Sequence, residues 1–163
     1  MTLYPDWWKG GYPDVELVVA DLLQKFLNYL TPQGLAVTWR PDDIDELLAA
    51  GKTVVQVHRG GLGADGLWDA SAVQLGVLSA TRQNSWEVME YLRQVMLAHD
   101  GGSAVHREDG SLTAVGQVYE ITGPQDLTDL DPEERLVPAT FHVGLRLPTL
   151  PDYARFIRDS IPL

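Results

Sequence analysis

The clearest pattern in the chain is the alternation of apolar and other residues over residues 136–148. The apolar positions fall on every second residue, at Val137, Ala139, Phe141, Val143, Leu145 and Leu147. The positions between them are Pro138, Thr140, His142, Gly144 and Arg146. Because successive side chains of a strand point to opposite faces, the pattern predicts a strand with one buried face and one polar face. One-sided burial is typical of a mixed or antiparallel sheet and not of a parallel sheet covered on both sides.

Two long amphipathic helices are predicted from apolar residues spaced three and four apart. The first follows Asp14, a residue type that caps helices, and ends near residues 31–34. Its apolar side consists of Val15, Val18, Val19, Leu22, Leu23, Phe26, Leu27 and Leu30. The second spans residues 86–98, where Asn84 and Glu87 resemble a capping box. Shorter helices are predicted at residues 42–50 and 152–161.

Further strands are predicted from β-branched content and alternation. They span residues 35–39, 53–58, 70–78 and 115–121. Asp109-Gly110 lies between two extended stretches and favours a type I′ hairpin. The order of elements predicts an α+β fold, with a mixed, largely antiparallel sheet and helices packed mainly on one face.

The length of 163 residues fits a single domain with a sizeable core. Within it, residues 1–13 form an aromatic N-terminal arm, and residues 149–163 form a C-terminal tail with a short helix. The arm holds Tyr4, Trp7, Trp8 and Tyr12. These side chains either fold back onto the chain's own core or anchor a neighbouring subunit, since Trp and Tyr concentrate at interface hot spots.

Composition and charge exclude several classes of function. The net charge of −11 repels phosphate backbones and disfavours stable binding of nucleic acid. The chain has no cysteine, so disulfides and thiolate metal sites are excluded. Its start does not resemble a signal peptide, and no apolar run reaches the roughly 20 residues of a membrane span. Its four histidines have no metal-ligand spacing, and no nucleophile motif is present. We therefore expect no catalytic site, no metal site and no membrane partner.

One glycine-rich segment matches a cofactor-binding pattern. Residues 61–66, Gly-Leu-Gly-Ala-Asp-Gly, fit G-x-G-x-x-G and follow a predicted strand. Dinucleotide binding needs a helix directly after the loop, and the sequence after Gly66 alternates like a strand. We expect a flexible loop between two strands and no cofactor. The alternative, a small-molecule or nucleotide-binding domain that uses this loop, would require a helix after Gly66.

An acidic loop precedes the last strand. Its carboxylates are Asp126, Asp129, Asp131, Glu133 and Glu134. The spacing does not match the calcium-binding loop, which needs a turn glycine and a terminal glutamate. We expect a solvated loop without a bound metal.

The layout of the chain resembles a known family over residues 14–148. After the first helix come Val54–Gly61 and Asp69–Leu75, then Ser85-Trp-Glu-Val-Met-Glu-Tyr-Leu-Arg-Gln-Val-Met-Leu. Gly123-Pro-Gln and the acidic run then lead into Arg135-Leu-Val-Pro-Ala-Thr-Phe-His-Val-Gly-Leu-Arg. This order resembles the tail terminator (tail completion) proteins of long, non-contractile-tailed phages, especially siphophages that infect actinobacteria.

The resemblance implies a structural virion protein without catalytic residues or a cofactor. Such a subunit forms a hexameric ring that caps the tail tube, stops tube polymerisation and joins the tail to the head-side connector. Implied partners are further copies of the chain, the tail-tube protein and the connector protein, with double-stranded DNA passing through the ring without specific binding. The implied location is the head-proximal end of the virion tail, after assembly in the host cytoplasm.

A head-tail connector or neck protein of the same particle remains an alternative. Whether the chain is a terminator or a connector, three segments are candidates for contact with other subunits or partners. They are the aromatic arm, the glycine-rich loop up to Trp68, and the acidic loop. The candidate residues are Trp7, Trp8, Arg59, Leu62, Trp68, Asp126, Asp129, Asp131 and Glu134.

Overall fold

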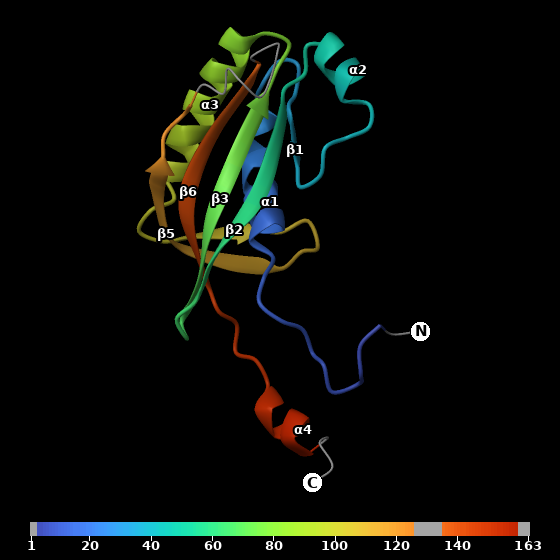
Figure 1. Cartoon of the computed structure of the whole chain (residues 1–163), viewed down its shortest axis with the longest axis vertical. Helices are drawn as coiled ribbons and strands as arrows, with labels where there is room; N and C mark the ends of the chain where they lie inside the picture. Colours follow the sequence, from blue (N-terminus) through green and yellow to red (C-terminus); the bar gives the residue numbers. More distant parts are fainter. Residues whose placement is uncertain (1–2, 126–134, 160–163) are drawn as a thin grey trace.

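The structure, a computed structural model, describes residues 3–125 and 135–159 (Figure 1). The described helices are α1 (Val15–Leu27), α2 (Ile44–Ala49), α3 (Arg82–Leu97) and α4 (Tyr153–Asp159). The described strands are β1 (Leu35–Val37), β2 (Val54–Ala64), β3 (Trp68–Leu78), β4 (Ser103–His106), β5 (Leu112–Thr122) and β6 (Leu136–Arg146). The acidic-loop candidates Asp126, Asp129, Asp131 and Glu134 lie outside the described residues.

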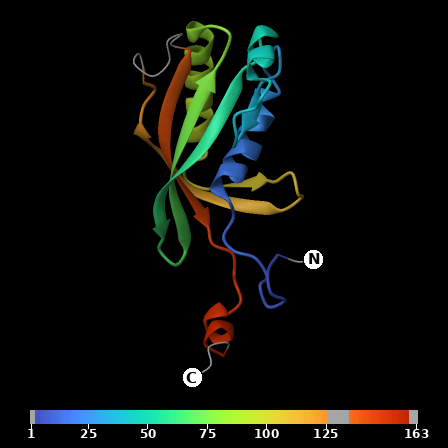
Figure 2. The same cartoon turned by 45° about the vertical axis from the view of Figure 1, so that its right-hand side comes forward.

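The described strands form one six-stranded sheet in the order β1-β2-β3-β6-β5-β4. β1 is parallel to β2, and all other neighbours are antiparallel. Side chains of α1 and α3 share one buried cluster with the sheet, and Figures 1 and 2 show both helices on the same side of it. α2 packs a small second cluster on Val54, whose side chain points away from that of its buried neighbour Val55. The predicted α+β fold, with helices mainly on one face, is confirmed.

β6 lies in the interior of the sheet between β3 and β5, and its apolar face is the one predicted. That face is at most 2% exposed at every position within the strand: Val137, Ala139, Phe141, Val143 and Leu145. The predicted strand was two residues too long, since β6 ends at Arg146.

The opposite face of β6 is more covered than the alternation predicted. His142 is only 9% exposed, and its ring stacks on the ring of Tyr119 in β5 at 4.4 Å between centroids. Pro138 and Gly144 are also buried, while Arg146 is exposed. The Tyr119 ring of the neighbouring strand thus covers His142, part of a face that looks polar in sequence.

The helix starts show one confirmed and one wrong prediction. The Asp14 side chain accepts a hydrogen bond from the Glu16 N–H at 2.9 Å, so Asp14 caps α1 as predicted. α3 begins at Arg82, four residues before the predicted start at residue 86, and Thr81 is its cap. The Thr81 hydroxyl accepts from the N–H of Asn84 at 3.2 Å, so Asn84 is inside the helix. The added residues carry no apolar periodicity, which is why the sequence pattern missed them.

The β4–β5 connection differs from the predicted two-residue type I′ turn. The Arg107 N–H donates to the Ser111 carbonyl at 2.9 Å, and the Gly110 N–H donates to the Arg107 carbonyl at 3.0 Å. Three residues therefore form the loop, with Gly110 last at a φ of +82°. This is the three-residue hairpin in which a glycine takes the left-handed position.

Candidate assembly surfaces

The β2–β3 hairpin changes from buried to exposed along its length. Val54, Val55 and Val57 are fully buried, whereas residues 58–67 are all exposed. The predicted loop over residues 59–66 is therefore wrong for most of its length, since β2 continues to Ala64 and pairs with β3. Figure 1 shows the hairpin tip beyond the ends of α1 and α3. Leu62, a predicted contact residue, is 58% exposed on this projecting part.

The hairpin turn is held by Asp65 and Gly66. The Asp65 carboxylate accepts hydrogen bonds from the N–H groups of Trp68 at 2.9 Å and Leu67 at 3.1 Å. These bonds, that from Trp68 above all, lower the pKa of Asp65. Gly66 has a φ of +96° at the first central position, where a type II′ turn requires a positive φ. β3 follows directly, so the helix that the nucleotide-binding alternative requires is replaced by a strand.

Arg59 lies where the buried and exposed parts of the hairpin meet. Its guanidinium contacts both carboxylate oxygens of Asp69, at 3.0 and 3.2 Å, and Asp69 is only 2% exposed. The Arg59 N–H donates to the Glu16 carboxylate of α1 at 2.7 Å. Arg59 thus ties the hairpin to itself and to α1. Its predicted contact with a neighbouring subunit remains a prediction.

Trp68 packs across the sheet, over the adjacent strand β6 and onto β5. Its ring lies against Gly116 of β5, where a β-carbon would overlap it. Its strand partner Arg146 places the guanidinium carbon 6.0 Å from the ring centroid, a cation–π distance. Trp68 is half-buried, which leaves part of the ring open to a partner.

Trp7 and Trp8 pack on the other end of the chain. Trp8 stacks on Tyr153 of α4 at 4.8 Å between ring centroids, and Trp7 stacks on Phe156 at 6.1 Å. The Tyr153 hydroxyl donates to the Gly10 carbonyl at 2.8 Å and accepts from the Lys9 N–H at 3.0 Å. Of the two alternatives for the arm, packing on the core is therefore wrong, and contact with a neighbouring subunit remains a prediction. We call residues 3–12 and 148–159 the terminal module, and residues 13–147 the body.

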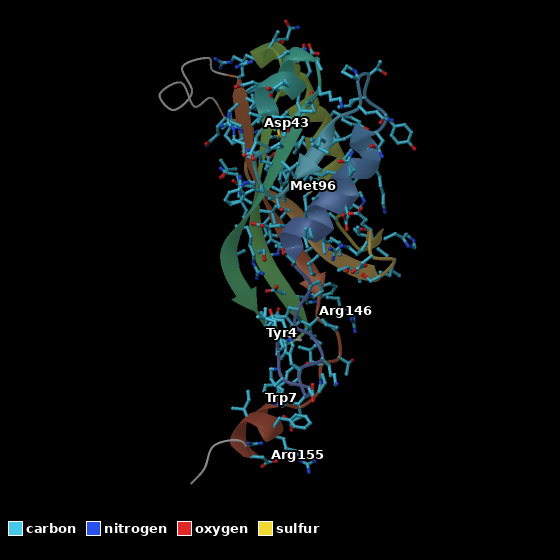
Figure 3. The ribbon with its side chains drawn as sticks, turned by 90° about the vertical axis from the view of Figure 1, so that its right-hand side faces the viewer. Tyr4, Trp7, Asp43, Met96, Arg146 and Arg155 are labelled. Carbon is cyan, nitrogen blue, oxygen red and sulfur yellow. The ribbon has the colours of Figure 1, made fainter. Side chains whose placement is uncertain are left out.

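Tyr153 and Phe156 are contact residues that sequence reasoning missed. Their spacing of three places both on one side of a short helix, which was the one available indication. Figure 3 places Tyr4, Trp7 and Arg155 at the end of the molecule opposite Asp43.

One edge of the sheet is closed by a side chain. The Ala36 N–H of β1 donates to the Gln24 side-chain oxygen at 2.8 Å, and the Gln24 amide nitrogen donates to the Gly34 carbonyl at 3.0 Å. Gln24 thus takes the hydrogen-bonding place of a further strand. Because open edges invite pairing with other chains, this contact disfavours assembly through β1.

A groove lies beside α1, between β1 and the β4–β5 hairpin. It has a volume of about 620 Å³ and is lined by apolar residues such as Leu35 as well as by charged and amide side chains, including Asp21, Gln24 and Lys25. The Arg107 Nε donates to the Asp21 carboxylate at 2.6 Å in its wall. Over residues 3–125 and 135–159, no group of three His, Asp or Glu side chains could hold a metal ion. No helix in the same residues is long and apolar enough to cross a membrane.

Comparison with known proteins identifies the body. A family model described as phage tail termination protein matches residues 11–151. The match spans β1 to β6 with α1 to α3, and leaves out Trp7, Trp8 and α4. A search of curated proteins found no match. Since the matched segment is well over half of the chain, this chain belongs to the phage tail termination proteins, which are structural proteins of the virion tail and not enzymes.

Proposed function

We propose that the chain assembles into a ring that caps the tail tube, ends tube polymerisation and joins the tail to the head-side connector. The family match over residues 11–151 carries this proposal. The ring would lie at the head-proximal end of a long, non-contractile tail, and a hexamer would suit the resemblance already described. A ring built by head-to-tail contacts can match the symmetry of the tube ring beneath it.

The charge of the chain supports a role around a DNA channel. A net charge of −11 repels phosphate, so double-stranded DNA could pass through the ring without adhering to it. Arg93, one of the few basic residues, donates to carboxylates of Glu120 and Glu90 at 2.9 and 3.1 Å. Its positive charge is therefore neutralised within the chain.

The projecting part of the β2–β3 hairpin supports contact with a neighbour or with the tube. It is exposed on residues 58–67, and the main-chain pairing with β3 holds it in an extended form. Arg59 and Asp69 fix its base, and the exposed Leu62 lies in β2 at a bulge between the paired residues Gly61 and Gly63. The acidic residues Asp126, Asp129, Asp131 and Glu134 stay candidates for the same role.

The proposal is tested by assembling phage particles without this chain. We expect tail tubes that exceed their normal length and do not join heads, measured as a tube-length distribution by electron microscopy. Supplying the wild-type chain should restore one length and head joining. Tubes of normal length that fail to join heads would instead favour the connector or neck protein, and normal joined tails would contradict both.

A further inference from the structure

The two ends of the chain form a small aromatic unit outside the body. Lys9 and Tyr153 are 144 residues apart in sequence, yet the arm and α4 are in contact. The Tyr153 ring stacks on Trp8, and its hydroxyl bonds to the main chain of both Lys9 and Gly10. Figures 1 and 2 show α4 beyond the end of the sheet, connected to β6 by an extended segment. Within the described residues, the aromatic packing of Trp7 and Trp8 is made inside this unit.

Several apolar side chains of the terminal module remain partly exposed despite these ring contacts. No residue of α4 is buried, although the helix carries Phe156 at 42% and Ile157 at 49% exposure. Tyr4 and Leu3 in the arm are 58% and 85% exposed. A helix of seven residues is marginal in water unless packing stabilises it. Gathered exposed apolar side chains of this kind mark an interaction surface.

The charge distribution indicates which partner this surface fits. Within the terminal module, Lys9, Arg155 and Arg158 balance Asp6, Asp152 and Asp159, so the net charge of −11 lies on the rest of the chain. Two copies that met through their bodies would bring acidic surfaces together. Contact between a neutral apolar module and an acidic body avoids that repulsion and leaves Arg155 and Arg158 exposed to pair with carboxylates.

We propose that the terminal module of one copy docks on the body of a second copy of this chain and holds neighbouring subunits together. This inference rests on the proposed ring and names the surface through which neighbouring subunits of the ring would contact each other. The family match ends at residue 151, before α4, so Phe156 and Ile157 lie outside the matched region. Phe156 and Ile157 are the apolar anchors, with Arg155 and Arg158 at the rim of the contact.

The first test measures assembly of the full chain by sedimentation velocity over a range of concentrations. We expect the double variant Phe156→Ser/Ile157→Ser to need at least a tenfold higher concentration than wild type to assemble. Trp39→Ser is the matched control, because Trp39 is an apolar side chain of the body that is 82% exposed. It should assemble like wild type. At a concentration where all three chains are monomeric, circular dichroism should show the same melting temperature for each.

The outcomes separate this inference from the proposed function. If the double variant assembles at the same concentration as wild type, the proposed module contact is overturned and the proposed ring is not. A wild-type chain that stays monomeric at every concentration overturns the self-assembled ring and the module contact together.

A second test identifies what covers the module. The natural chain has no cysteine, so Ile157→Cys introduces a single thiol. We expect its reaction with a maleimide to slow as the chain alone is concentrated, while Trp39→Cys reacts at an unchanged rate. Protection that appears only after tail tubes are added would assign the surface to the tube protein and overturn the contact between copies.

Discussion

The body and the terminal module differ in how completely their apolar side chains are buried. In the body, α1, α3 and the sheet share a cluster in which residues such as Phe141, Leu23 and Leu92 are completely buried. In the terminal module, α4 has no buried residue and depends on ring contacts with an arm from the other end of the chain. The difference indicates that the body is stable through its own core, and it motivates the proposal that a second copy stabilises the module.

The most severe test of this contrast compares two phenylalanines. Phe141→Ala removes a fully buried ring and should lower the free energy of unfolding by about 3–5 kcal/mol. Phe156→Ala removes a ring that is 42% exposed and should leave the unfolding of the body nearly unchanged. Urea titration of both variants at a concentration where the chain is monomeric measures the two effects. Equal losses would contradict the division into body and module.

A comparison of two arginines comes next in expected size. Arg59→Ala would leave the Asp69 carboxylate, 2% exposed, without its ion-pair partner. We expect a loss of about 1–2 kcal/mol, reduced because the Arg59 side chain is itself 38% exposed and screened by water. Arg158→Ala on α4 serves as the control and should not change unfolding of the monomer. An unchanged Arg59→Ala chain in urea titration would show that this ion pair does not hold the hairpin.

Substitutions of two glycines test the packing of the Trp68 ring on β5. Gly116→Ala would place a β-carbon in the Trp68 ring, and because the ring can shift, we expect a loss of about 1 kcal/mol. Gly61→Ala meets no atom within 4 Å and should be nearly neutral. Adding Trp68→Ala to Gly116→Ala should remove most of the penalty. Additive losses in the double variant, measured by urea titration, would mean that the two residues do not contact each other.

The smallest expected effect is a pH dependence from His142. Burial lowers the pKa of this imidazole, so the folded chain resists its protonation. Below the unfolded value of about 6.5, the unfolded chain takes up a proton that the folded chain excludes, and stability falls. Between pH 7 and pH 5, the melting temperature of wild type should therefore drop further than that of His142→Gln. If the melting temperatures of the two chains fall equally between pH 7 and pH 5, His142 does not cause the pH dependence of stability.

The sequence predicted the body well because its patterns are local. The burial of Phe141 followed from alternation along β6, and the start of α1 followed from Asp14. The sequence pattern did not predict the second half of β2, which runs to Ala64 because it pairs with β3. A glycine-rich segment has no apolar periodicity from which such pairing could be predicted. The cap of α3 at Thr81 was missed for a similar reason, since the first turn is polar.

The terminal module could not be predicted from sequence. Trp8 and Tyr153 meet only because both ends of the chain leave the body at the same end of the molecule, as Figure 1 shows. No local pattern near Trp8 refers to a partner at the far end of the chain. The aromatic content of the arm indicated that some contact exists, and the fold was needed to show which one.

The most direct measurement of the central claim is electron microscopy of purified tail tubes mixed with this chain. We expect a ring of this chain at one end of each tube, and tubes so capped should not extend when further tail-tube protein is added. The chain bound along the tube wall, or tubes that continue to grow from the occupied end, would contradict it.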